Sequence, residues 1–267
     1  MSDSGKISMK TENEERFAGA FSILQSSKVG AGTTAQKHVQ TMNVYAEEKA
    51  DGTFSLRYLN DNFVPVGKAW TVDKDTLLTE YTPEPDLYMN KVYPAMRELS
   101  KTIAHAERLR ESNQTYSAEY EFKRALRIDE TNIRATFGFG LVYLDRNDAE
   151  KAELVFRRLV TLEAAFDREH KHLFNEFGIK LRRAGLLDQA LEFYGRAEEY
   201  SHNDENLHYN RARAFEAKGE VGEALSSLEK ALAIRPDFHE ARKFRDGLRK
   251  GPSAGRKAVS GGRNGME

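Results

Sequence analysis

A recurrence of small residues every 34 to 38 positions is the feature of this chain that most constrains its fold. Four segments place an alanine four residues before a bulky side chain, and these alanines are separated by 34, 38 and 34 residues. The pairs are Ala118/Phe122, Ala152/Phe156, Ala190/Tyr194 and Ala224/Leu228. Twelve positions before each alanine stands a second small residue: Ala106, Gly140, Gly178 and Ala212. A period of this length predicts stacked copies of one supersecondary unit, because each unit buries its apolar face only against its neighbours.

The pattern resembles the tetratricopeptide repeat, a helix–turn–helix unit of about 34 residues. In that family two small residues let the paired antiparallel helices approach closely, and bulky residues fill the remaining space. The residues that fit this pattern are Gly140, Tyr143, Ala152, Phe156, Gly178, Ala190, Ala212, Ala224 and the helix-ending Pro236. The resemblance implies repeats at 99–132, 133–166, 171–204 and 205–238, and a capping helix at 239–250. The first repeat matches least well, and "DREH" at 167–170 interrupts the register.

The residues before the repeats show a different pattern. Between 38 and 60, β-branched and aromatic residues lie on both sides of Asp51-Gly52, which predicts a β-hairpin. A third strand is expected at 63–72, where Pro65 would confine it to an edge or a bulge. A short helix is expected at 73–81.

We therefore predict a mainly α protein, a helical-hairpin solenoid of about four repeats preceded by a small β-hairpin-containing module. A short β-module is marginally stable alone, so it is expected to lean on the first helices. The predicted organisation is a disordered start at 1–13, the β-rich module at 14–82, a linker and first helix at 83–98, the repeat domain at 99–250 and a disordered basic tail at 251–267.

Composition excludes several classes of function. The chain is 39% hydrophobic and 31% charged with a formal net charge of −1, which gives no reason to expect a nucleic-acid-binding protein. It has no cysteine, so disulfides and thiolate metal sites are absent. The most apolar window, 135–144, is far shorter than the roughly 20 residues of a membrane helix. With no signal-peptide core at the start, the sequence predicts a soluble cytoplasmic protein without a membrane partner.

No motif in the chain predicts catalysis, a cofactor or a metal. The segment "KVGAGTTAQK" (28–37) fails the phosphate-loop pattern, because Gly32 is followed by Thr33 where a lysine is required. It reads as a flexible glycine turn. His170 and His172 are two residues apart, so on a helix they point to different faces and do not form a chelating pair.

Tetratricopeptide proteins bind peptides or partner helices in a concave groove, and the resemblance implies that certain positions of each first helix line it. We call these positions the predicted groove: Phe137, Gly138, Leu141, Leu144, His172, Asn175, Arg182, Asn206, Tyr209, Asn210 and Arg213. They are apolar in the second repeat and rich in Asn and Arg in the third and fourth. Asn175 and Asn210 are similar to part of the clamp that holds two carboxylates in some family members, although its lysines are not at their expected positions.

Gly138 is expected to leave a gap beside Phe137 and Leu141, so that Gly138→Leu would keep the fold and weaken partner binding. Such a groove suits a protein or peptide segment with a hydrophobic anchor and an acidic or C-terminal carboxylate end.

The leading hypothesis from the sequence is a non-catalytic adaptor that binds a partner protein. An alternative is a regulatory protein that binds a nucleotide or small ligand in the β-module, through "KVGAGTT" and the single tryptophan, Trp70. A third is nucleic-acid contact through the basic end, where residues 239–267 hold eight Lys or Arg and three Asp or Glu. The partner, the pathway and the oligomeric state stay open.

Overall fold

The structure is a computed structural model that describes residues 16–29, 36–162, 165, 170–201 and 203–250. The chain divides into two compact units. Unit 1 comprises residues 1–104 and 124–132, and unit 2 comprises 105–123 and 133–267. The disordered ends predicted at 1–13 and 251–267 lie outside the described residues, as do the centre of the predicted glycine turn and most of the "DREH" segment.

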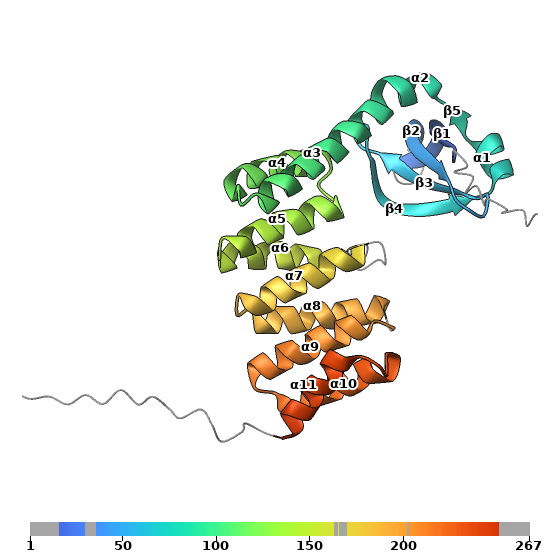
Figure 1. The fold of residues 1–267 in the computed structure, drawn as a ribbon. Helices are drawn as coiled ribbons and strands as arrows, with labels where there is room; N and C mark the ends of the chain where they lie inside the picture. Colours follow the sequence, from blue (N-terminus) through green and yellow to red (C-terminus); the bar gives the residue numbers. More distant parts are fainter. Residues whose placement is uncertain (1–15, 30–35, 163–164, 166–169, 202, 251–267) are drawn as a thin grey trace, which may run out of the picture. The chain divides into compact units, whose positions relative to one another are not determined.

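An antiparallel sheet forms the framework of unit 1 (Figure 1), with its strands in the order β4-β3-β2-β1-β5. The strands are β1 (Ala18–Val29), β2 (Gln36–Glu48), β3 (Phe54–Leu59), β4 (Pro65–Val72) and β5 (Thr82–Pro83). The predicted hairpin is β2–β3, and its turn contains Gly52 at a φ of 79°, a conformation that glycine adopts without steric cost. Pro65 begins the edge strand β4, where its missing N–H removes no ladder bond. Strand β1 was not predicted.

Both faces of this sheet are covered. On one face, Phe21, Val44 and Leu56 pack with Leu77 and Tyr81, from helix α1 (Lys74–Glu80) and the residue that follows it. The small β-module thus gains a core from a short helix that sequence patterning placed at 73–81.

On the other face, Ala20 and Tyr45 pack with Val92, which belongs to a π-helical turn at Tyr88–Val92. A short helix, α2 (Pro85–Leu87), precedes this turn, and α3 (Tyr93–Glu111) follows it without a break. The range 83–98, predicted as a linker and first helix, is therefore largely helical.

The turn between β3 and β4 binds the end of a helix within unit 1. Asn60 Oδ1 accepts hydrogen bonds from the backbone N–H of Asn62 and of Val64. Its Nδ2 donates to the carbonyl of Ile128 at 2.8 Å, and Asn62 Nδ2 donates to the same carbonyl and to that of Arg127. The last carbonyls of helix α4 (Thr115–Ile128), which lack partners within the helix, are satisfied in this way.

Unit 2 consists of helices that follow one another as antiparallel pairs (Figure 1). Beyond the parts of α3 and α4 that belong to it, its helices are α5 (Ile133–Asp145), α6 (Ala149–Thr161), α7 (Lys171–Arg183), α8 (Leu187–Tyr200), α9 (Glu205–Lys218), α10 (Val221–Ile234) and α11 (His239–Arg249). Helices α5, α7, α9 and α11 begin at the residues where the second, third and fourth repeats and the capping helix were expected to begin. The predicted fold class, a helical-hairpin solenoid preceded by a small β-module, is confirmed.

The small residues of the repeat pattern lie where helices meet. Ala152, Ala190, Ala212 and Ala224 are fully buried. A Cβ atom at Gly140 would lie 2.6 Å from the ring of Phe177, and one at Gly178 would lie 2.5 Å from the ring of Tyr194. Real Cβ atoms do not approach so closely, so both sites require glycine because an aromatic ring crosses the helix there.

The larger residues of the pattern fill the core, and polar caps delimit the helices. Tyr143 and Phe156 are buried, and Pro236 lies just beyond the end of α10. The carboxylate of Asp204 begins α9 by accepting the N–H groups of Asn206 and Leu207.

Candidate protein-binding surface

The apolar members of the predicted groove belong to the core. Phe137 is fully buried, and Leu141 and Leu144 are 1% and 5% exposed. The ring of Phe137 meets those of Phe177 and Phe193 edge-on, with centroids 5.7 and 6.1 Å apart. The expectation of an apolar anchor for a partner at the second repeat is therefore wrong, because neighbouring helices already cover these side chains.

The gap expected at Gly138 is also absent. A Cβ atom at this position would lie within 2.9 Å of three ring carbons of Phe122, a fully buried residue of α4. The space beside Gly138 is occupied by an aromatic ring from the preceding repeat. Gly138 is therefore a packing residue, and Gly138→Leu cannot leave the fold intact.

A network of charged side chains joins the first helices of three successive repeats. Arg110 of α3 donates to Asp145 of α5 at 3.1 Å and to Glu176 of α7 at 2.9 Å. Lys180 of α7 pairs with the other oxygen of Asp145. Burial alone would lower the pKa of Arg110, but Glu176 and Asp145 outweigh it and raise that pKa. Apart from the Nε atom of Arg110, which has no partner among the described residues, these charges satisfy one another, so this part of the first-helix surface offers a partner few free polar groups.

The predicted groove residues on α7 take no part in this network of paired charges. His172 is exposed, whereas Asn175 and Arg182 are half-buried. The Oδ1 atom of Asn175 and the Nε atom of Arg182 are buried and have no hydrogen-bond partner in the part of the chain that the structure describes. Buried polar atoms are nearly always bonded, so the Oδ1 atom of Asn175 is a candidate for contact with a bound molecule. An unbonded Nε atom is less distinctive, because Arg110, Arg146 and Arg211 have one too; unlike these, Arg182 has no paired guanidinium nitrogen.

Some of the predicted groove residues on α9 pack against other residues of the fold, and others are open to a partner. The ring of Tyr209 packs against Phe238 and Phe244, with centroids 5.1 and 6.1 Å away, which makes it a contact toward α11. Asn206 Nδ2 donates to Glu205 at 3.3 Å.

Asn210 is half-buried and Arg213 is exposed. Neither side chain has a hydrogen bond or ion pair with any described residue. Sequence position alone could not distinguish Asn210 and Arg213, which are open to a partner, from Tyr209. Whether a residue of α9 is covered depends on where α11 packs.

A second polar cluster, centred on Glu119, was not predicted from the sequence. Glu119 of α4 binds Lys123 at 2.6 Å, Arg146, and the hydroxyl of Tyr143 at 3.1 Å. Burial would raise the pKa of Glu119, but these hydrogen bonds dominate and lower it to about 2. The guanidinium of Arg146 also lies 4.5 Å from the ring of Tyr116. The cluster joins helices of two repeats, and the repeat pattern carries no signal for it.

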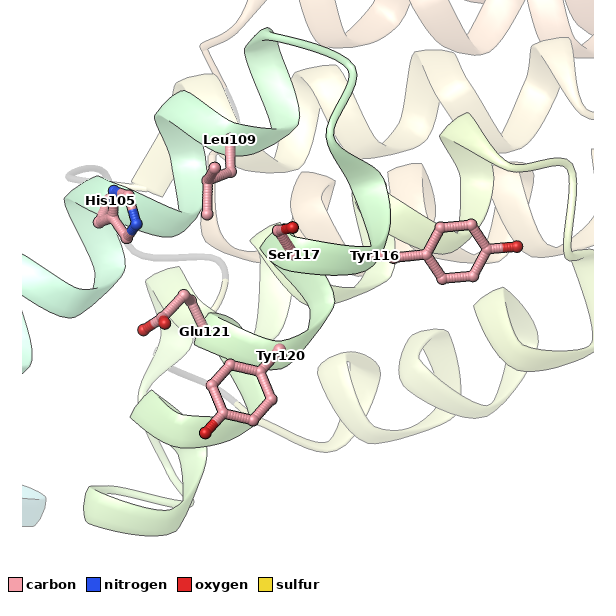
Figure 2. Close-up of a pocket in the computed structure, with 6 residues that line it drawn as sticks. All are labelled: His105, Leu109, Tyr116, Ser117, Tyr120 and Glu121. Carbon is pink, nitrogen blue, oxygen red and sulfur yellow. The ribbon is translucent and has the colours of Figure 1, made fainter.

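An open hollow of about 490 Å³ lies between α3 and α4. Figure 2 shows its lining residues: His105, Leu109, Tyr116, Ser117, Tyr120 and Glu121. Tyr116 and Tyr120 are 78% and 61% exposed, and their rings point away from each other, so they do not form two facing walls. The hollow contains no member of the predicted groove.

The described residues contain no cluster of three or more His, Asp or Glu side chains placed to hold a metal ion. No helix in the described part of the chain is long and apolar enough to span a bilayer. Trp70, which motivated the ligand-binding alternative, packs on the ring of Tyr58 at 4.7 Å and donates to the hydroxyl of Tyr81 at 3.4 Å. Its contacts are thus internal to the sheet and its covering helix.

Stacked helical hairpins with a polar first-helix surface define a helical-repeat protein, a class that binds other proteins along extended surfaces. The sequence pattern of the family described as Tetratricopeptide repeat matches residues 205–238, the range predicted for the fourth repeat. Residues 205–238 of this chain thus carry the sequence pattern of a tetratricopeptide repeat.

One curated relative is Anaphase-promoting complex subunit 3 of Schizosaccharomyces pombe (strain 972 / ATCC 24843), which is 26% identical over 145 residues. The match covers 52% of this chain and 21% of the relative, so the chain spans only about a fifth of that protein.

Similar solved structures include a thermophilic tetratricopeptide repeat protein of Thermus thermophilus, with 23% identity and a TM-score of 0.41 over 56% of this chain and 80% of that one. MamA from Desulfovibrio magneticus RS-1 has 14% identity and a TM-score of 0.45 over 57% and 84%. YrrB, described as a tetratricopeptide repeat protein with an unusual peptide-binding site, has 22% identity and a TM-score of 0.28 over 54% and 90%.

Proposed function

We propose that this protein is a non-catalytic, cytoplasmic adaptor that holds a segment of a partner protein against α7 and α9. The observation that carries the proposal is a set of polar side chains there without partners among the described residues: Asn175, Arg182, Asn210 and Arg213. Three of the four are half-buried, so their positions are restricted even without a ligand. Polar groups that are held in place but unbonded favour binding, because little side-chain entropy remains to be lost.

The chemistry of these side chains indicates the kind of segment. An asparagine amide both donates and accepts, which matches the N–H and C=O groups of an extended or helix-terminal peptide backbone. Arginine favours carboxylates, because its planar guanidinium donates two parallel hydrogen bonds. We infer that the segment carries an acidic side chain or a C-terminal carboxylate.

The paired charges on α3, α5 and α7 limit where the segment lies. Arg110, Asp145, Glu176 and Lys180 would have to exchange partners to bind it, whereas Asn210 and Arg213 would not. The proposal therefore places the segment at the third and fourth repeats and assigns no anchoring role to the second.

Selection of peptides tests the proposal directly. A library of random twelve-residue peptides is selected on the full-length protein, and the affinities of the enriched peptides are measured by fluorescence anisotropy. Asn175→Ala/Asn210→Ala should weaken binding by about tenfold or more, the usual effect of losing two hydrogen bonds in an interface. Asn90→Ala, an exposed asparagine of unit 1, is the matched control and should bind as the wild type does. Equal affinity of the double variant and the wild type would show that the surface is assigned wrongly.

A further inference from the structure

Three arginines near the junction of α7 and α9 lack an acidic partner. Arg182 and Arg183 end α7, and Arg213 lies on α9, the next first helix. None of the three forms a hydrogen bond or ion pair with any described residue. By contrast, Arg110, Arg134, Arg146, Arg211 and Arg235 of the same unit are each paired with a carboxylate. Unit 2 thus leaves a group of positive charges unneutralised at one place.

A buried hydroxyl lies at the same place. Tyr194 of α8 is fully buried, and its ring crosses α7 over Gly178, where a Cβ atom would lie 2.8 Å from the hydroxyl oxygen. Gly178 is one helical turn before Arg182, so the buried hydroxyl lies against the side of α7 that carries this arginine. The hydroxyl has no hydrogen-bond partner among the described residues. Buried tyrosine hydroxyls normally find one.

The electrostatic environment connects these groups. Burial raises the pKa of the Tyr194 hydroxyl, and the charges of Arg182 and Arg213 act against this rise, so both fields reach the hydroxyl. The pKa of Arg182 is lowered by burial and, to a smaller extent, by repulsion from Arg213 and Arg183. Tyr194 and Glu216 oppose this lowering, but Glu216 does not pair with the arginine. An unbonded donor within the electrostatic field of mutually repelling cations favours a ligand that is negatively charged and accepts hydrogen bonds.

We propose that Arg182, Arg213 and the hydroxyl of Tyr194 bind one oxyanion, a carboxylate or phosphoryl group carried by the bound protein segment. This inference rests on the proposed adaptor function and names the group that its surface selects. One oxygen of the ligand accepts the Tyr194 hydroxyl proton in a hydrogen bond, and the others accept guanidinium N–H groups from the two helices. Arg183 adds positive charge beside the site. Binding would satisfy the unpartnered Tyr194 hydroxyl and Arg182 Nε and neutralise the repulsion between the arginines.

The test uses the full-length protein and two simple probes, inorganic phosphate and acetate, at constant ionic strength. The Nε–Hε resonance of Arg182 is followed by NMR. We expect it to shift saturably with at least one probe. Tyr194→Phe and Arg213→Gln should each lower the affinity for that probe by about tenfold, which is the usual effect of losing a hydrogen bond to a charged group. Arg108→Gln, which removes an exposed arginine of α3, should change its affinity less than about twofold.

The two probes identify the source of the oxyanion. A response to phosphate alone assigns a phosphoryl group, and a response to acetate assigns a carboxylate. The oxyanion site is refuted if neither probe shifts the Nε–Hε resonance of Arg182. It is also refuted if Tyr194→Phe and Arg213→Gln bind the probes as tightly as the wild type does.

Tyr194→Phe also gives a readout that a structural role would not produce. Removing an unpartnered buried hydroxyl should raise the midpoint of urea unfolding in the absence of anions while weakening phosphate or acetate binding. A lower midpoint would show that the hydroxyl is bonded within the fold, and it would overturn the proposal.

The peptides selected for the adaptor test separate the two proposals. If their binding falls in Asn175→Ala/Asn210→Ala but is unchanged in Arg213→Gln and Tyr194→Phe, the adaptor surface stands and the oxyanion site fails. If anions bind saturably and no peptide is selected, the adaptor proposal fails; anion binding by Arg182, Arg213 and Tyr194 then stands, but a protein segment as the carrier of the anion is refuted.

Discussion

Replacement of Gly138 by alanine should destabilise the protein, although alanine is the better helix former. A Cβ atom there would lie within 2.9 Å of three ring carbons of Phe122, whereas carbon atoms in contact are normally about 3.5–4.0 Å apart. The nearest ring carbon would lie 2.2 Å from the new Cβ, so the fully buried ring would have to move by more than about 1 Å against close-packed neighbours. Overpacking of this kind costs about 3 kcal/mol at the upper end of its range, and the gain in helix propensity returns about 1 kcal/mol. We therefore expect the free energy of unfolding to fall by about 2 kcal/mol.

Gly195→Ala provides the matched control for this prediction. Gly195 lies within α8, and nothing comes within 4 Å of a Cβ atom built at this position. The same substitution should therefore stabilise the protein by up to about 1 kcal/mol. Urea unfolding of both variants, followed by circular dichroism, gives the two changes on one scale.

A second variant tests the cause of the destabilisation. If the clash with Phe122 is responsible, Gly138→Ala combined with Phe122→Leu should lose less stability than the sum of the two single changes, because the smaller side chain relieves the contact. A Gly138→Ala protein that is as stable as Gly195→Ala would refute the packing argument.

Other predictions concern pH and polar contacts. Burial lowers the pKa of His208, so below about pH 6.5 the unfolded chain binds a proton that the folded chain does not. The free energy of unfolding should therefore fall as the pH decreases through about 6.5, by at most about 1.4 kcal/mol per pH unit, and this pH dependence should be absent from urea unfolding of His208→Gln. Asn60→Ala should destabilise unit 1 by about 1–2 kcal/mol, measured by hydrogen exchange of its sheet, because the Ile128 carbonyl loses one of its two donors and the turn N–H groups of Asn62 and Val64 lose their acceptor. Arg110→Ala should lower the free energy of unfolding by about 3 kcal/mol, measured in urea, since it leaves two part-buried carboxylates without that partner; a variant as stable as the wild type would contradict this.

More of the fold than of the candidate protein-binding surface could be predicted from the sequence. Close contact between paired helices requires small residues at fixed positions, so Ala152, Ala190 and Ala224 reveal the repeats even in a single sequence. Strand β1 carried no comparable signal, since "AGAFSILQSSKV" is rich in alanine and serine. It was missed although its partner β2 was found.

The candidate surface depended on contacts between residues far apart in sequence. A helical position shows which residues share a face, but not what covers that face. Leu141 and Phe137 occupy groove positions of the pattern and yet are buried by neighbouring repeats. Gly138 looked free because Phe122, which fills the space beside it, belongs to another helix. The Asn and Arg positions of the third and fourth repeats were identified from the pattern, whereas the buried hydroxyl of Tyr194 could be found only from the structure.

The division of the chain into units has a consequence for the order in which the protein folds during synthesis. Unit 1 is discontinuous, because residues 124–132 belong to it although 105–123 belong to unit 2. The asparagines of the β3–β4 turn are made early, but the carbonyls they bind, at Arg127 and Ile128, leave the ribosome 65 to 68 residues later. Unit 1 is therefore complete only after residues 105–123 of unit 2 have been made, and no single cut in the chain yields both units whole.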